Sequence, residues 1–332
     1  MWFKNLIFIY LAALLLISCS QNKGSVSSGK DFEIIVVFSQ PAWVGKVGDT
    51  IRKTLMRDFP GMLEAEPEFD LVFVAEKDFR KILQTHRNIL VIDINTTNKH
   101  SEVETLADVW SHPQRVIKIK AKSDTAFFNL FAKHKDAIRD LFNLSESDRL
   151  STQNAIGRNA EAEKILEKDF GIKMAISKDF KLVKKTNDFL WLKADAKGNS
   201  LSLMIYTFPY KDTSLMRPAA VMIAREHYAK SCNSRLYGGT YISLENNNYQ
   251  PISQKILFKW MYALQTRGLW ISDSDSLAGS FINYTIVDAP RQRIVVFDGY
   301  VNYQGKPMRN FIRHLEAIIW GAEFTEPVKV EK

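Results

Sequence analysis

Cys19 is the residue of this 332-residue chain whose position most plainly suggests chemistry. It follows an apolar run, Leu6 to Ile17, from which only Ser18 separates it, and it precedes a small, polar stretch. A cysteine thiolate is a nucleophile, and it can take up a diacylglycerol group as a thioether. The position of Cys19 therefore suggests covalent lipidation at a processed N-terminus.

The residues before Cys19 have the composition of an export signal. Met1 and Lys4 form a short positive region, and the apolar run after them has 12 residues. A membrane-spanning helix needs about 20 such residues, whereas a signal peptide needs about 7 to 15. The run ends in Leu-Ile-Ser-Cys, which resembles the bacterial lipobox. We predict that residues 1–18 are a lipoprotein signal peptide. The alternative is an ordinary signal peptide with an incidental cysteine.

The anchor that this motif implies is a palmitate-type lipid on Cys19, and the membrane is therefore the first expected partner. Each buried CH₂ contributes about 0.8 kcal/mol, so two or three acyl chains hold a protein stably where one does not. Residues 19–30 are mostly small and polar, which predicts a flexible tether. Cys232 is the only other cysteine and has no flanking histidine, so we interpret it as a packed thiol.

A second group of residues suggests recognition. Several aromatic side chains fall in or beside predicted strands of the second half, with Arg267 and Gly268 between two of them. They are Trp191, Tyr206, Phe208, Tyr210, Trp260, Tyr262 and Trp270. An aromatic floor with an arginine can stack a sugar or hold an anion. We predict a ligand site of Arg267, Trp270, Tyr206, Phe208 and Tyr210, with Trp270 exposed at a loop edge. The alternative is that these aromatic residues form the core of a sheet, because aromatic residues favour strands.

Catalytic chemistry has weaker support. Asp93, Asp288 and Asp298 are the carboxylates that a hydrolase acting on envelope material could use for acid–base catalysis. Asp93 and Asn95 follow a predicted strand, where they can equally cap the strand and start a turn. The charged residues at 225–227 are neighbours on one predicted helix and face different ways, which indicates solvated charges. We assign no catalytic residue.

Metal and cofactor sites are not expected. The six histidines include no pair at metal-ligand spacing, and the sequence has no HExxH or CxxC motif, no GxSxG motif and no P-loop. His314 lies beside the apolar face of a predicted helix, where a packed histidine with one satisfied nitrogen is the usual finding.

The net charge of the chain is +8. It becomes +7 when residues 1–18 are removed, because Lys4 is the only charged residue in that segment. This surplus favours anionic neighbours. The basic residues are spread along the chain without a nucleic-acid motif, so we expect no nucleic-acid binding.

The elements that must position these residues divide into two halves. In the first half, the sequence pattern predicts a helix capped by Asp49 and strands at 31–39, 69–75, 87–94 and 114–122. A long helix follows over 124–170, with a polar, solvent-facing middle and a break near 143–148. The second half predicts a hairpin of strands 187–194 and 200–210, a helix at 217–230, a strand at 254–268 and a hairpin of strands 280–289 and 293–303. A last helix begins with Pro307 and ends at Gly321.

The fold class that follows is α+β in two lobes. We predict a mixed α/β lobe with a long helix over 31–171, an antiparallel sheet covered by helices over 172–322, and a tail over 323–332.

Several short stretches, in this order, resemble a family of uncharacterised Bacteroidetes lipoproteins known only as a domain of unknown function. They are SSGKDFEIIVVF, GDTIRKTL with FPG after it, RNILVIDI, DFLWL, YTFPY, RGLW and RIVVFDGYV. The resemblance covers about residues 28–320 and implies no known activity, ligand or catalytic residue.

The resemblance has one implication for location. Lipoproteins of such bacteria often reach the cell surface when an acidic cluster follows the cysteine, whereas the first acid here is Asp31. We therefore expect an envelope lipoprotein in the outer membrane that faces the periplasm, acting as a non-catalytic module that binds an envelope protein or glycan. The alternative function is a periplasmic hydrolase.

Overall fold

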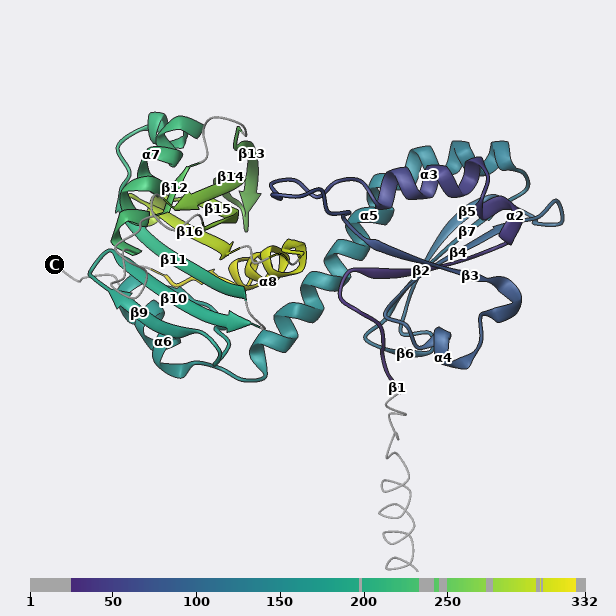
Figure 1. Ribbon diagram of the computed structural model, residues 1–332, viewed down its shortest axis with the longest axis horizontal. Helices are drawn as coiled ribbons and strands as arrows, with labels where there is room; N and C mark the ends of the chain where they lie inside the picture. Colours follow the sequence, from purple (N-terminus) through teal and green to yellow (C-terminus); the bar gives the residue numbers. More distant parts are fainter. Residues whose placement is uncertain are drawn as a thin grey trace, which may run out of the picture.

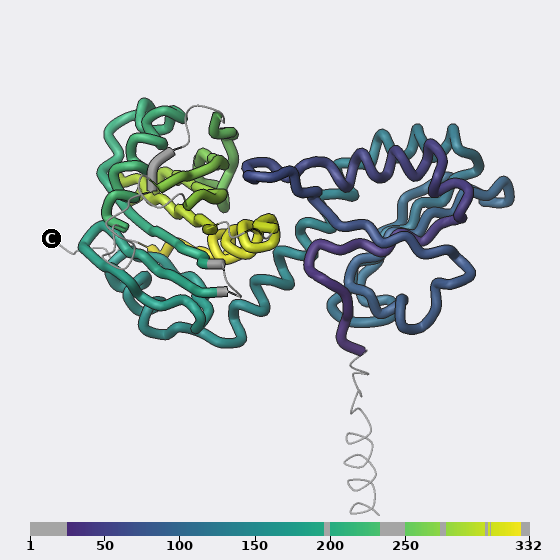
Figure 2. The backbone as a smooth tube through the Cα atoms, in the orientation of Figure 1, coloured from purple at the N-terminus to yellow at the C-terminus, as the bar shows by residue number. Residues whose placement is uncertain are grey.

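The computed structural model describes residues 25–196, 199–232, 242–244, 250–272, 277–302, 305 and 307–326. Two lobes lie side by side and are joined by the long helix α5 (Asp124–Ala155) (Figures 1 and 2). The chain thus has the predicted α+β architecture in two lobes. Cys19 and the signal segment lie outside the described residues.

The first lobe is built on a five-stranded sheet of order β3-β2-β4-β7-β5. Its strands are β2 (Glu33–Phe38), β3 (Asp70–Ala75), β4 (Asn88–Ile94), β5 (Glu102–Ala107) and β7 (Arg115–Ala121). All neighbours are parallel except β5, an edge strand that we did not predict. Helices α3 (Lys46–Leu55) and α5 pack on one face through a core that contains Ile51, Phe127 and Phe131.

The other face of this sheet carries a smaller apolar cluster that includes Ile35, Ile89 and Trp110. Short elements lie around it. They are β1 (Ser25–Val26), η1 (Glu76–Asp78), α4 (Lys81–Gln84) and β6 (Ser111–His112). Helix α2 (Gln40–Trp43) instead lies beside α3, and its Trp43 stacks on Phe73 at the first core. The predicted flexible tether over 19–30 is therefore wrong for its second half, because β1 pairs with β6.

Two helix starts differ from the prediction. Gly45, not Asp49, is the N-cap residue of α3, and Asp49 lies in the first turn, where it accepts a hydrogen bond from Arg52 at 2.6 Å. Pro307 precedes the N-cap residue Met308 of α8 (Arg309–Trp320) instead of starting the helix.

Helix α5 runs without a break through residues 143–148. The Ser123 hydroxyl caps it by accepting a hydrogen bond from the Ala126 N–H at 3.2 Å. Its predicted solvent-facing middle is wrong, since Glu146, Arg149 and Asn154 are all buried. They are buried because α5 passes the start of β4, where Asn88 donates to Glu146, and then packs on α8, where His314 contacts Asn154.

The second lobe is an antiparallel sheet of order β12-β14-β15-β16-β11-β10-β9, with β13 also paired to β14. Its strands are β9 (Lys181–Lys185), β10 (Phe189–Ala196), β11 (Asn199–Pro209), β12 (Ile242–Leu244), β13 (Ile252–Phe258), β14 (Met261–Ser272), β15 (Ala278–Asp288) and β16 (Arg293–Asn302). Both predicted hairpins, β10–β11 and β15–β16, are confirmed.

Helices cover both faces of this sheet. Helix α7 (Pro218–Ala229) packs on one face, and α8 packs on the other. Helix α6 (Ala160–Ile165) and the turn η2 (Leu166–Phe170) share the α8 face through Ala162, Leu166 and Phe170. The chain therefore enters the second lobe at the turn after α5, before the predicted boundary at 171. Shorter elements complete the lobe: β8 (Ile172–Lys173), η3 (Thr213–Met216), η4 (Lys230–Cys232), η6 (Ala289–Arg291) and β17 (Glu323–Phe324).

The predicted strand over 254–268 is in fact a tight hairpin. Lys259 and Trp260 form a two-residue turn with φ of 47° and 74°, as a type I′ turn requires. Trp260 therefore does not share a strand face with Tyr262, and it is 91% exposed. In the described part of the chain, no helix is both long and apolar enough to cross a membrane.

Candidate functional site

The sheet of the second lobe divides the predicted ligand site into two parts. Arg267 and Trp270 stand three residues apart on β14, and side chains alternate between faces along a strand. Arg267 therefore lies on the α8 face and Trp270 on the α7 face. Trp270 is only 3% exposed, and its Nε1 donates a hydrogen bond to the Val301 carbonyl at 3.1 Å. The prediction of an exposed Trp270 is wrong, because β14 extends to Ser272 and the Trp270 ring packs edge-on against Tyr300 in the core of the α7 face.

Tyr206 and Phe208 of β11, and Tyr210 directly after it, lie on the α7 face. Tyr206 is fully buried and stacks on Tyr228 of α7, with ring centroids 4.1 Å apart. Burial raises the pKa of Tyr206 well above its usual value, so its phenol stays neutral. Phe208 and Tyr210 are half-buried, and Phe208 borders a shallow hollow of about 470 Å³ with Tyr228, Arg291 and Arg293. The alternative interpretation, a packed core, thus holds for Tyr206 and Trp270.

The α7 face also holds a buried ion pair. Arg225 and Asp298 are both fully buried, with Nε and Oδ2 2.8 Å apart, and the Arg225 guanidinium lies 3.9 Å from the Phe281 ring centroid. Asn283 donates a hydrogen bond to the same Asp298 oxygen at 2.8 Å. Our interpretation of Arg225 as a solvated charge is wrong, because α7 turns this side chain toward the sheet.

The other two candidate carboxylates lie in different surroundings, and an ion-pair partner is present for the Asp288 carboxylate. Asp288 is buried and accepts a hydrogen bond from Arg293 at 2.8 Å. Asp93 lies at the end of β4, where its carbonyl accepts a hydrogen bond from Asn98 at 3.2 Å. Asn95 accepts the Thr97 N–H at 3.0 Å, which is the turn that the alternative interpretation predicted.

Arg267 faces a cleft where the two lobes meet. The loop at residues 56–69 of the first lobe reaches across and packs Phe59 and Met62 into the core of the second lobe (Figure 1). Gly61 has φ of 82° and lies directly on β14, where a Cβ atom would stand 2.9 Å from the Cβ of Arg267. The interlobe cleft beside this contact has a volume of about 310 Å³. Its lining comprises Phe32, Arg57, Phe59, Pro60, Glu68, Asn143, Ser147, Gln254, Gln265, Arg267, Arg313, Glu316, Ala317 and Trp320.

The wall of the cleft from the second lobe is a hydrogen-bonded network centred on Glu316. This carboxylate accepts hydrogen bonds from Arg267 and from the Tyr284 hydroxyl, the latter at 3.0 Å. Burial raises the pKa of Tyr284 well above its usual value, which keeps the phenol a proton donor. Arg267 also lies 4.8 Å from the Phe59 ring centroid, and its Nη1 has no hydrogen-bond partner among the described residues.

The wall from the first lobe is centred on Glu68. Glu68 accepts hydrogen bonds from Arg57 at 2.5 Å and from Asn143 at 2.7 Å. Arg313 of α8 crosses to this wall, donates to the Glu68 carbonyl at 2.9 Å and lies 3.6 Å from the Phe32 ring centroid. Burial lowers the pKa of Arg313 to about 9, so its guanidinium is still charged at neutral pH.

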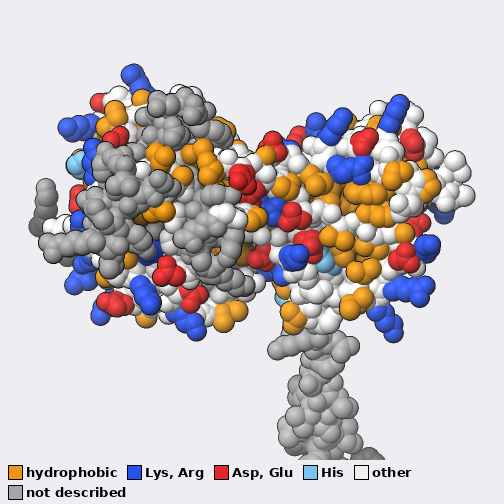
Figure 3. Space-filling view, in the orientation of Figure 1, with side chains coloured by type: hydrophobic (Ala, Val, Ile, Leu, Met, Phe, Trp, Pro, Cys, Tyr) orange, Lys and Arg blue, Asp and Glu red, His pale blue; other side chains and the backbone are white. Residues whose placement is uncertain are grey.

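The cleft combines features that bind polar organic molecules. Three arginines face two glutamates, which leaves one positive charge in excess, and Phe59 and Trp320 offer aromatic surface. Figure 3 shows acidic and basic side chains together where the lobes meet. An aromatic surface beside convergent donors and acceptors suits an uncharged or anionic sugar or peptide.

The described residues contain no group of histidine, cysteine and carboxylate side chains that could hold a metal ion. His314 packs with its Nε2 atom 2.6 Å from Asn154 Oδ1, as predicted for a histidine with one satisfied nitrogen. Burial raises the pKa of Cys232 to about 12, which makes this thiol unreactive at neutral pH.

Comparison with known proteins assigns both halves of the chain. Residues 27–155 match the model of a domain of unknown function (DUF8532), and residues 159–321 match that of another domain of unknown function (DUF4837). Both halves of the chain are therefore similar to domains of unknown function. The two matched regions meet at the turn between α5 and α6. The prediction of a family known only as a domain of unknown function is confirmed, although two such domains match, and its Bacteroidetes lipoprotein character stays a prediction.

The similarity of this two-domain chain to solved structures is weak. No curated protein matches it. A point mutant of the protein Mog1 and the Saccharomyces cerevisiae Ran-binding protein Mog1p each align with 47% of the chain at 9% identity and a TM-score of 0.33. The alignments cover 92% and 91% of those two chains, respectively.

Sequence reasoning found Arg267 but missed its neighbours in the cleft. The period of two along β14 places Gln265 on the same face as Arg267, and this pattern was available in the sequence. Arg313 and Glu316 stand three apart on α8 and so share a helix face. The contribution of Glu68 and Phe59 depends on docking between the two domains, for which the sequence carries no local signal.

Proposed function

We propose that this protein is a lipid-anchored, non-catalytic binding or assembly module of the bacterial cell envelope. In this proposal a lipid on Cys19 holds it in the outer membrane, facing the periplasm, and the interlobe cleft recognises an envelope glycan or protein. The observation that supports recognition is the cleft itself, where Arg267, Gln265 and Glu316 stand beside the aromatic rings of Phe59 and Trp320.

The anchor is tested by Cys19→Ser. Because the thiol is the acceptor of the diacylglycerol group, we expect the variant to accumulate as an unlipidated, full-length precursor. Metabolic labelling with a palmitate analogue, followed by mass spectrometry, measures both properties. Label retained on the serine variant would refute the assignment.

The cleft is tested with soluble muropeptides, which present a sugar and carboxylates together. We expect wild-type protein to bind them in calorimetry, and Trp320→Ala or Ser147→Trp to weaken binding by about tenfold or more. The matched control is Trp260→Ala, which removes an exposed tryptophan of the same lobe outside the cleft. Equal affinity of all three variants, or no binding by the wild type, would rule out muropeptide recognition in the cleft.

The same muropeptides also test the alternative function, a hydrolase. Asp298 and Asp288 are buried in ion pairs with arginines, and both glutamates of the cleft accept hydrogen bonds from arginines. Glycoside hydrolysis requires one carboxyl group that donates a proton. Chromatography of the muropeptides after incubation distinguishes the two functions, because a binding module leaves them intact.

A further inference from the structure

The ordered body of the protein begins close to the residue that carries the proposed lipid. Ser25 is six residues after Cys19, and it starts β1, which pairs in parallel with β6. The N–H groups of Ser27 and Ser28 donate to the carbonyls of His112 at 3.0 Å and Thr85 at 2.9 Å. The chain is therefore held against the first lobe from residue 25 onward.

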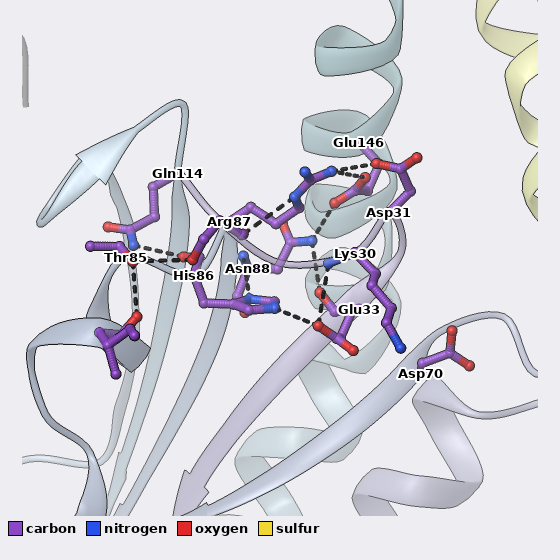
Figure 4. Close-up of polar contacts among 12 residues, drawn as sticks. Lys30, Asp31, Glu33, Asp70, Thr85, His86, Arg87, Asn88, Gln114 and Glu146 are labelled. Atoms are coloured by element: carbon purple, nitrogen blue, oxygen red, sulfur yellow. Dashed lines mark hydrogen bonds and ion pairs between the residues drawn. The ribbon is translucent and has the colours of Figure 1, made fainter. Parts of the chain in front are cut away.

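A buried polar network secures the next residues (Figure 4). Glu33 Oε1 lies 2.9 Å from His86 Nε2, and Asp31 accepts a hydrogen bond from Arg87. Gly29, with φ of 100°, passes so close to His86 that a Cβ atom would stand 2.2 Å from Nε2. Burial opposes ionisation of Glu33, but the hydrogen bonds from His86 and the Lys30 N–H lower its pKa below the usual value. Residues 25–33 are thus an integral part of the first lobe.

Covalent geometry then limits the distance between this lobe and the lipid. An extended chain spans at most about 3.5 Å per residue, so Ser25 lies within about 20 Å of Cys19. A lipid-anchored Cys19 stands at the membrane surface. The end of the first lobe that carries β1 must therefore stay near that surface.

This end has the surface chemistry of a membrane contact. Val26 and Ile82 are each 82% exposed, and Ser28 and Ser111 both contact Thr85 next to α4, which brings β1, β6 and α4 together. Exposed charges adjoin them. The basic ones are Lys77, Arg80 and Lys81, and the acidic ones are Glu76 and Asp78. Figure 3 shows apolar and basic side chains along the lower edge of the first lobe.

We propose that the β1–β6–α4 end, with Val26, Ile82, Arg80 and Lys81, rests on the lipid surface of the membrane that holds the anchor. The apolar side chains enter the boundary between headgroups and acyl chains, and the basic ones bind lipid phosphates. The inference rests on the proposed lipid anchor and adds a defined orientation of the first lobe on the bilayer.

The test uses the full-length lipidated protein in vesicles of phosphatidylethanolamine and phosphatidylglycerol. A photo-crosslinking amino acid replaces Ile82 in one sample and Ile223 in the other. Ile223 is a matched control, because it is 72% exposed and lies on α7 of the second lobe. We expect lipid adducts from position 82 to exceed those from position 223 by about fivefold or more. Equal or absent adducts from protein that floats with the vesicles would overturn the inference.

A second sample separates this failure from failure of the anchor itself. Cys19 of the mature chain is coupled to a maleimide lipid, which spares the buried Cys232. If the cellular protein does not float but the coupled protein gives adducts at position 82, the anchor assignment fails and the surface assignment stands. If the coupled protein floats without such adducts, the surface assignment fails.

Discussion

At the residue scale, the buried charges on the α7 face are the least expected feature of the molecule. Burial raises the pKa of Asp298, and the attraction of Arg225 and the hydrogen bond from Asn283 only partly oppose this effect. The free-energy cost of removing the Asp298 carboxylate from water is therefore larger than the stabilisation that Arg225 and Asn283 provide. Such a pair specifies how α7 docks on the sheet more than it stabilises the fold.

A mutant cycle follows from this balance. Arg225→Met leaves Asp298 as an unpaired buried charge, and Asp298→Leu does the same to Arg225, so each single change should destabilise the protein by about 3–5 kcal/mol. The double variant should recover most of that loss. Urea denaturation of the four proteins measures the effect, and a double variant as unstable as the sum of the single ones would contradict the argument.

At the scale of elements, the loop at residues 56–69 of the first lobe caps the N-terminus of helix α8 in the second lobe. Helix α8 begins with unpaired N–H groups, as every helix does. The buried Glu66 carboxylate accepts those of Met308 at 2.7 Å and Arg309 at 2.9 Å. A negative charge at this end also interacts favourably with the helix dipole.

Glu66→Ala should therefore destabilise the protein by about 1–2 kcal/mol, since two N–H groups of α8 lose their acceptor. Glu76→Ala, which removes an exposed carboxylate of the same lobe, is the control. Thermal denaturation compares the two variants. Equal melting temperatures would show that water replaces the cap at no cost.

At the scale of the whole molecule, the contact between α5 and α8 contains a group that titrates. Burial lowers the pKa of His314, and the charges of Asp31 and Asp179 only partly offset this effect. Neutral His314 donates from Nε2 to Asn154 Oδ1. Below the usual histidine pKa of about 6.5, the unfolded chain binds a proton that the folded protein does not. The free energy of unfolding therefore decreases as the pH is lowered.

We expect this loss to be at most about 1.4 kcal/mol per pH unit below pH 6.5, and to end once the pH falls below the pKa of the folded state. Denaturation of wild type and His314→Gln at pH 7.5 and 5.5 checks the prediction. The pKa of Glu33 is lowered from 4.5, so its own stabilising contribution is lost only at more acidic pH. If the free energy of unfolding of His314→Gln depends on pH as strongly as that of the wild type, His314 is not the group responsible for the loss of stability.

Local patterns predicted the elements well and their burial poorly. The alternating strands and turn residues located both hairpins of the second lobe, because side-chain period and turn chemistry depend on adjacent residues. The same patterns misplaced Trp260, which occupies a turn, and Trp270, whose ring packs in the core of the α7 face. Arg225 and the middle of α5 looked solvent-facing because their partners are distant in the sequence.

The sequence by itself determined the α+β class and the order of most strands and helices, and it indicates a lipid-bearing Cys19, because each depends on residues within one short window. Only the tertiary structure decided that Arg267 faces an interlobe cleft, that Tyr206 and Trp270 lie in the core, and that the chain is held from residue 25. These outcomes depend on surfaces from separate lobes that meet in space, and the free energy of that contact is not encoded in any local pattern.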